Sequence, residues 1–212
     1  IEYDKSITQL PFNMVEAEKL LDSAGWLRSD LGLRQKDGKP LALKFVSQNV
    51  AEYAAISQDL QKQWRSIGID LDVKLKAEED MQGGILTRHE YDVLLYGISL
   101  GPDPDVFAYW HSSQTDVRSA SRLNLSEYKS KVADTSLEAG RTRIDPGLRA
   151  VKYKSFLQAW RDDAPAIALY QPRLLYVARN ELVGFNARRL SSSIDRLNNI
   201  QNWTVLQDRV LK

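Results

Sequence analysis

Residues 41–75 read LALKFVSQNVAEYAAISQDLQKQWRSIGIDLDVKL, and this stretch decides the fold class. The segment LALKFVS (41–47) is typical of a strand, and IDLDVKL (69–75) alternates apolar and charged residues as a second strand does. Between them, Asn49-Val-Ala-Glu52 has the spacing of a capping box and predicts a helix that ends before Gly68. We expect the two strands to be parallel, with a right-handed crossover between them.

Further elements are expected on both sides of this unit. Upstream, Asn13-Met-Val-Glu16 is a second capping box, which opens a helix over 14–24 that stops at Gly25. Downstream, the apolar periodicity predicts helices over 78–88, over 127–139 after a Ser126 cap, and over 147–164. In the last of these helices, Val151, Phe156 and Trp160 are expected to face inward. Strands are predicted at YDVLLYGIS (91–99), IALYQ (167–171) and LLYVA (174–178). Without repeats or a linker, residues 1–212 are expected to form one α/β domain.

The composition is that of a soluble globular protein. Hydrophobic residues make up 43% of the 212 residues and charged residues 27%, and the longest apolar runs are too short to cross a bilayer. The 29 Lys and Arg residues nearly balance the 28 Asp and Glu residues, so the net charge of +1 gives no general attraction to nucleic acid. Cysteine is absent from the sequence, which excludes disulfides, thiol catalysis and thiolate metal sites.

The sequence offers few residues for catalysis or metal binding. Neither His89 nor His111 has a second ligand at a metal-binding spacing, and the P-loop, GxGxxG and GxSxG motifs are absent, so we expect no metal and no cofactor. Asp103 and Asp105, with Tyr109, could serve a carboxylate-dependent hydrolase. The alternative is that Asp103 or Asp105 caps the helix suggested by VFAYW, and we expect no enzyme activity.

The stretch YDVLLYGISLGPDPDVFAYW (91–110) joins an apolar strand to a loop rich in glycine and proline. Such a strand end leaves backbone groups without partners in its own sheet, and ligands of open α/β sheets bind beyond the carboxyl ends of strands. Residues 96–101 could therefore pair with an extended ligand as an added strand, or form an ordinary turn with solvated amides. Tyr109 and Trp110, which follow the loop, could line a cleft or pack in the core.

Several segments, taken in order, resemble the extracellular solute-binding proteins of the peptide/nickel class (family 5), the capture subunits of ABC importers. The similar segments are AEKLLDSAGW (17–26), DGKPLALKFVS (37–47), LQKQWRSIGIDLDVK (60–74), YDVLLYGISLGPDPD (91–105), YWHSSQ (109–114), Asn124 to Tyr128, and DDAPAIALYQPRLLYV (162–177). Each segment is short, and it is their order along nearly the whole chain that makes the resemblance specific.

The resemblance implies the C-terminal lobe of a longer two-lobed protein that closes around its ligand by a hinge. Its fold would be a periplasmic-binding-protein type II-like lobe, a mixed sheet flanked by helices. The implied partners are a peptide or another small solute, ABC permease subunits and the missing N-terminal lobe, with no nucleic acid. Such proteins are extracytoplasmic, either periplasmic or anchored as lipoproteins. The opening IEYDKSITQLPFN has no Met and no signal-peptide pattern, so we expect a fragment.

The resemblance also implies a binding site without catalytic residues. The residues expected to pair with the backbone of a ligand are Tyr96, Gly97, Ile98, Ser99 and Gly101. Asp103 and Arg88 would be charge anchors, and Tyr109 and Trp110 apolar walls. Peptide-binding members carry a Trp at Ile98 and an amine-binding Asp at Gly101, so a sugar, a metal chelate or another solute stays open as an alternative to a peptide. A surface adhesion or signalling module on the same lobe is a third possibility.

Overall fold

The computed structural model describes residues 4, 6–100, 103, 105–116, 118–119, 122–173, 175–185 and 193–206. The chain divides into two compact units, and each is described by itself. The first unit is Ile1–Ile98 with Asp105–Pro165, and the second unit is Ser99–Pro104 with Ala166–Lys212. The single domain expected over residues 1–212 concerns the whole chain and stays a prediction.

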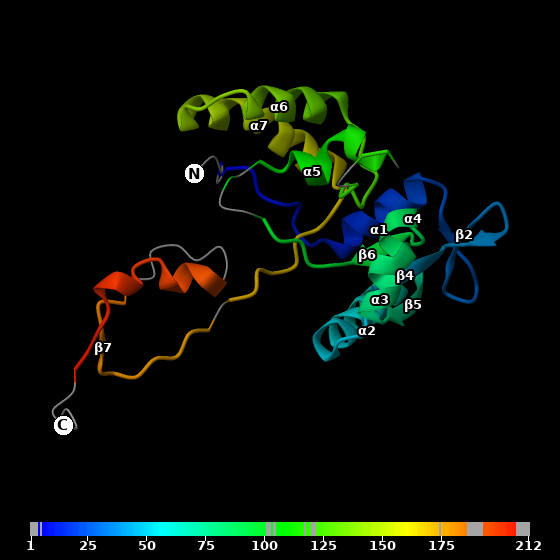
Figure 1. Cartoon of the computed structure of the whole chain (residues 1–212). Helices are drawn as coiled ribbons and strands as arrows, with labels where there is room; N and C mark the ends of the chain where they lie inside the picture. Colours follow the sequence, from blue (N-terminus) through cyan, green and yellow to red (C-terminus); the bar gives the residue numbers. More distant parts are fainter. Residues whose placement is uncertain are drawn as a thin grey trace. The chain divides into compact units, whose positions relative to one another are not determined.

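The N-terminal part of the first unit is built around a three-stranded parallel sheet (Figure 1). Its strands are β4 (Ala42–Gln48), β5 (Asp70–Lys76) and β6 (Val93–Leu95), in the order β5-β4-β6. Helix α2 (Ala51–Ser66) connects β4 to β5, so the predicted strand–helix–strand unit and its parallel pairing are confirmed. The strand expected over 91–99 is shorter, because it pairs with β4 only as far as Leu95.

Helices cover both faces of this sheet. Phe45 and Val46 are neighbours in β4, so their side chains point to opposite faces. Phe45 lies in a buried cluster with residues of β5 and with Leu60 and Trp64 of α2. Val46 is buried against Met81 on the other face. Burying side chains of this size stabilises the fold by about 1.5–3 kcal/mol each.

The helix predicted over 78–88 is present and has an irregular centre. It consists of α3 (Glu78–Asp80), the π-helix η1 (Met81–Ile85) and α4 (Leu86–Arg88), and it ends at His89, whose φ is 51°. π-Helical turns are rare, occur mostly as single turns within α-helices, and are frequent at functional sites. This segment packs beside the end of β6, since Met81 and Ile85 share a cluster with Tyr96.

The N-terminal helix α1 (Met14–Ser23) is capped as predicted, because Asn13 Oδ1 accepts a hydrogen bond from the Glu16 N–H at 3.0 Å. The capping box predicted at Asn49 is wrong: Val50 occupies the N-cap position of α2 and no side chain caps it. The backbone of Val50 is extended, so the helix starts one residue later than the box requires.

A small antiparallel sheet, which the sequence reasoning missed, follows α1. It contains β1 (Leu27–Arg28), β2 (Arg34–Lys36) and β3 (Lys39–Pro40). The buried Arg34 side chain holds this sheet against the rest of the unit: it donates to the carbonyls of Ile67 and Trp26, both at 2.7 Å, and pairs with the Asp22 carboxylate. Parallel and antiparallel pairing thus occur in separate sheets, and the α/β class with flanking helices is confirmed.

The C-terminal part of the first unit is helical. It contains α5 (Phe107–Trp110), the 3-10 helix η2 (Ser112–Thr115), α6 (Lys131–Arg141) and α7 (Pro146–Asp163), of which α6 and α7 lie side by side (Figure 1). The predicted helix start after Ser126 is wrong, since Ser130 caps α6 through the Ala133 N–H. In α7, Phe156 is buried as expected and Trp160 packs on the same cluster, whereas Val151 is 67% exposed.

The second unit contains little regular structure. β7 (Leu182–Val183) and β8 (Thr204–Val205) pair antiparallel, and two 3-10 helices, η3 (Ser193–Leu197) and η4 (Ile200–Asn202), lie between them in sequence. The strands predicted at IALYQ and LLYVA are wrong for the residues described, which have no strand pairing there. An alternating pattern marks a segment able to pair, but a strand forms only where a neighbour supplies hydrogen bonds. In the described part of the chain, no helix is both long and apolar enough to cross a membrane.

Candidate functional site

Strand β6 is an edge strand. Within the described residues it pairs with β4 on one side and with no strand on the other. The chain then continues through Tyr96, Gly97 and Ile98, whose backbone groups make no hydrogen bond to any described residue. Unpaired backbone at a sheet edge is the feature that an added strand requires.

The Tyr96 side chain is fixed rather than free. Its ring packs against the cluster of Val46, Met81 and Ile85, and its hydroxyl accepts a hydrogen bond from Gln82 Nε2 at 2.9 Å. Gln82 belongs to the π-helix and also donates to a Glu78 carboxylate oxygen at 2.9 Å. The π-helix therefore helps to hold the Tyr96 side chain at the end of β6.

Gly97 lies against a tyrosine that the sequence reasoning missed. A Cβ atom built on Gly97 would lie 2.9 Å from the hydroxyl of Tyr53, in the first turn of α2. The chain leaves β4 and β6 at the same edge of a parallel sheet, so residues after one strand end are neighbours of residues after the other. Applying that rule to the residues after β4 would have identified Tyr53.

The expected anchor Arg88 lies away from this strand end. It ends α4, before β6 begins, so the length of β6 separates it from Gly97. Its Nε donates to a carboxylate oxygen of Glu90 at 2.6 Å, and this hydrogen bond lowers the pKa of Glu90. Glu90 accepts only from the Nε–H of Arg88, so the other guanidinium N–H groups remain for a ligand carboxylate.

Three of the expected site residues belong to the part of the chain from 99 to 104. Ser99 and Asp103 are in the second unit and have exposed side chains. Gly101 lies outside the described residues. Their role in binding stays a prediction.

Asp105 has a structural role. Its carboxylate accepts a hydrogen bond from the Phe107 N–H at 3.0 Å and forms an ion pair with Arg141 at 2.9 Å. The guanidinium of Arg141 also lies over the Phe107 ring, 4.1 Å from its centroid. The carboxylate thus holds the backbone at the start of α5 and is already neutralised by an arginine. The predicted helix cap is wrong for Asp105, since Val106 occupies the N-cap position and no side chain caps it.

The aromatic residues after the loop differ in their surroundings. Trp110 packs edge-on against Trp160 with ring centroids 5.5 Å apart, next to the buried cluster that contains Phe156. These are the contacts of a core residue. Tyr109 is half-buried on the same short helix.

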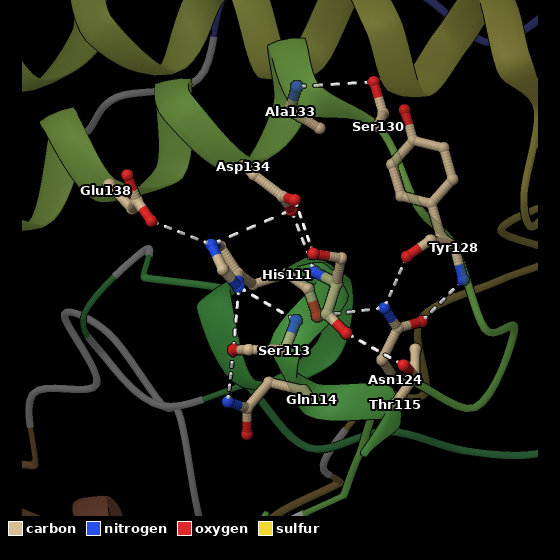
Figure 2. Close-up of polar contacts among 11 residues, drawn as sticks. His111, Ser113, Gln114, Thr115, Asn124, Tyr128, Ser130, Ala133, Asp134 and Glu138 are labelled. Carbon is tan, nitrogen blue, oxygen red and sulfur yellow. Dashed lines mark hydrogen bonds and ion pairs between the residues drawn. The ribbon is translucent and has the colours of Figure 1, made fainter.

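A polar network around His111 ties the segment after α5 to α6 (Figure 2). His111 Nδ1 accepts from the Ser113 N–H at 3.1 Å, so the ring proton belongs on Nε2, which lies 3.2 Å from a Glu138 carboxylate oxygen. Asp134 accepts from the Ser112 N–H at 2.8 Å. The buried amide of Asn124 donates to the His111 carbonyl at 3.1 Å.

This network explains two of the sequence segments that carried the resemblance. YWHSSQ supplies the imidazole and the two serines, and the stretch from Asn124 to Tyr128 supplies the amide. Both are therefore structural in the first unit. The described residues contain no group of three or more His, Asp or Glu side chains arranged to hold a metal ion.

Comparison with known proteins then identifies the family. The model of the bacterial extracellular solute-binding proteins, family 5 (middle), matches residues 2–119, more than half of the chain. The chain belongs to this family. The resemblance drawn from the short sequence segments is thereby confirmed.

This solute-binding protein is similar to several known members. It is 24% identical to the oligopeptide-binding protein AppA of Bacillus subtilis over 94% of the chain and 36% of the relative, and 25% identical to OppA of Mycobacterium bovis over 89% and 31%. The chain thus spans about a third of the length of the curated relatives that it matches. Their names describe binding proteins and no enzyme activity.

Solved structures confirm the fold. AppA of Bacillus subtilis in complex with a nonapeptide superposes with a TM-score of 0.77 at 24% identity, over 97% of this chain and 40% of that chain. NikZ of Campylobacter jejuni in complex with Ni(L-His) gives a TM-score of 0.75 at 25% identity, over 96% and 41%. The predicted type II lobe is therefore the fold of this solute-binding protein, and the same fold holds a peptide in one neighbour and a nickel chelate in the other.

Proposed function

We propose that this solute-binding protein serves an ABC importer and captures oligopeptides, whose backbone pairs with the chain after β6. The observation that carries the proposal is the unpaired backbone of Tyr96, Gly97 and Ile98 at the edge of the parallel sheet. Ser99 and Gly101 extend the same stretch in sequence. Recognition through the backbone ignores ligand side chains, so we infer a site that accepts many sequences.

A charged peptide terminus needs a partner, because a buried ammonium without one costs several kcal/mol. The sequence has Gly101 where peptide-binding members carry an Asp, and we propose Asp103 as the substitute. Arg88 would receive a ligand carboxylate through the guanidinium N–H groups that Glu90 does not engage. Tyr109 completes the proposed set as an apolar wall, whereas Trp110, also expected there, packs on the core cluster beside Trp160.

The proposed setting follows from the family. We infer that the remainder of the protein supplies a second lobe that closes over the ligand, and that permease subunits receive the loaded protein. Members of the family are extracellular proteins. We propose an extracytoplasmic location, either periplasmic or as a surface lipoprotein, and no catalysis.

A non-peptide solute is the second candidate. It is favoured by the missing acidic residue at Gly101 and by the similarity to NikZ, which was solved with Ni(L-His). The two candidates differ in what holds the ligand, since a chelate has no extended backbone to pair with a strand. A hydrolase is disfavoured, because Asp105 is engaged with Phe107 and Arg141.

The proposal is tested by binding of synthetic peptides to the full-length protein. Backbone N-methylation removes one N–H donor at a time, and we expect it to weaken binding at alternate ligand positions, as strand pairing requires. Gly97→Val should weaken binding by roughly tenfold or more, because a Cβ at this position would lie 2.9 Å from the Tyr53 hydroxyl and the backbone that pairs would have to shift. Gly83→Ala is the matched control, since no atom lies within 4 Å of its added Cβ. Peptide affinity that is insensitive to N-methylation and to Gly97→Val would remove the strand from the site.

A further inference from the structure

Gly97 is needed for space rather than for its backbone conformation. Its φ lies outside the left-handed region, so a residue with a side chain could adopt the same backbone. The Tyr53 hydroxyl, however, would lie only 2.9 Å from an added Cβ, closer than such contacts allow. Glycine at this position therefore lets a polar group of α2 reach the strand end.

The Tyr53 hydroxyl is unusual among the tyrosines of the first unit. Tyr91 donates to the Leu125 carbonyl at 2.7 Å, and Tyr128 donates to an Asp163 carboxylate oxygen at 2.6 Å. The hydroxyl of Tyr53 makes no hydrogen bond to any described residue, and it is not among the buried unpaired polar atoms found there. It is therefore open to a partner from outside the described chain, and a partly buried tyrosine hydroxyl normally has one.

The geometry points to Tyr53 as a ligand-binding residue whose hydroxyl donates a hydrogen bond to a main-chain carbonyl oxygen of the bound peptide. This inference rests on the proposed function. A peptide that pairs with Tyr96–Ile98 would run past Gly97, the residue that Tyr53 contacts. A backbone N–H has one hydrogen, which strand pairing uses, whereas a carbonyl oxygen has two lone pairs and can accept a second bond.

The first test compares Tyr53→Phe with the full-length wild-type protein, using oligoalanine peptides of graded length as probes. Phe keeps the ring and its packing, so the expected loss reflects the hydroxyl, about 3- to 10-fold in affinity for one neutral hydrogen bond. Gln63→Ala, on an exposed position of the same helix, is the control and should bind as the wild type does. Unchanged affinity of Tyr53→Phe overturns the inference.

The second test asks whether Gly97 acts through the same contact. Gly97→Ala should displace the Tyr53 ring and weaken binding, and the double variant should be little worse than either single variant, because both lose one interaction. Probes with one alkene in place of a peptide bond locate the acceptor: at one ligand position the effect of Tyr53→Phe should vanish. If the effects of Tyr53→Phe and of the alkene replacement add at every ligand position, the hydroxyl does not contact the ligand backbone.

The outcomes separate this inference from the function on which it rests. Wild-type binding of oligoalanine with no effect of Tyr53→Phe leaves peptide capture standing and removes Tyr53 alone. Failure of the wild type to bind any oligoalanine overturns peptide capture, and the role of Tyr53 falls with it.

Discussion

Gly68 and Gly32 have nearly the same left-handed backbone, with φ values of +89° and +79°, but very different surroundings. An added Cβ on Gly68 would lie 2.8 Å from Arg34 Cγ and 3.1 Å from the Gly32 carbonyl oxygen, whereas one on Gly32 meets no atom within 4 Å. The turn between α2 and β5 therefore packs tightly against the buried Arg34 side chain, which leaves no room for a side chain at Gly68.

Gly68→Ala is expected to lower the free energy of unfolding by about 2–4 kcal/mol, since backbone strain and a clash with buried groups add. Gly32→Ala should cost only the backbone strain, about 1 kcal/mol. Urea unfolding of the two variants measures the difference. Equal losses would mean that the close packing around Gly68 contributes nothing.

Tyr128 links stability to alkaline pH. Burial, together with the hydrogen bond to Asp163, raises the pKa of its hydroxyl from 10.0 to about 12. Burial also raises the pKa of Tyr91. Between pH 10.0 and about 12 the folded protein holds protons that the unfolded chain releases. The stabilising effect is thus complete below pH 10 and is lost as pH rises through the folded pKa.

We expect tyrosine absorbance at 295 nm to show a step well above pH 10 in the folded protein, and unfolding free energy to fall over the same range. Tyr128→Phe should remove part of the late step. A single titration of all tyrosines near pH 10 would contradict the assignment.

At the scale of elements, sequence periodicity correctly predicted the longer helices and strands, which have a regular apolar face. The spacing of apolar residues predicted α1 and the β4–α2–β5 unit. Gly25 and Gly68, which both have positive φ, marked where α1 and α2 end. Strands of two or three residues, such as β1 to β3, have too few positions to show a period. Tyr53 was missed because its place beside Gly97 arises from strand pairing, which no local pattern encodes.

The start of α6 illustrates how capping competes along the chain. Ser126 and Ser130 are both suitable N-caps by residue type, but Ser126 Oγ donates to the buried Asn124 side chain at 3.3 Å, while Ser130 Oγ accepts from the Ala133 N–H at 3.4 Å. Ser130→Ala should therefore destabilise by about 1 kcal/mol, and Ser126→Ala by less. Thermal melts of the two variants compare them directly, and the opposite ranking would place the helix start at Ser126.

At the scale of the whole molecule, the chain spans about a third of its curated relatives, and the proposed site uses only part of what such proteins have. The edge after β6 offers backbone pairing on one side of a ligand. Affinity should therefore be far lower for the isolated chain than for the full-length protein, since closure by a second lobe removes the remaining ligand surface from water. Calorimetry on both forms with one peptide measures the difference, and equal affinities would make the second lobe dispensable.

The central claim is capture of peptides through their backbone, and mass spectrometry of what co-purifies with the full-length protein tests it most directly. The protein is purified gently and its ligand released by denaturation. The account predicts a mixture of short peptides with little sequence in common. A single sugar, metal chelate or other non-peptide solute would contradict it.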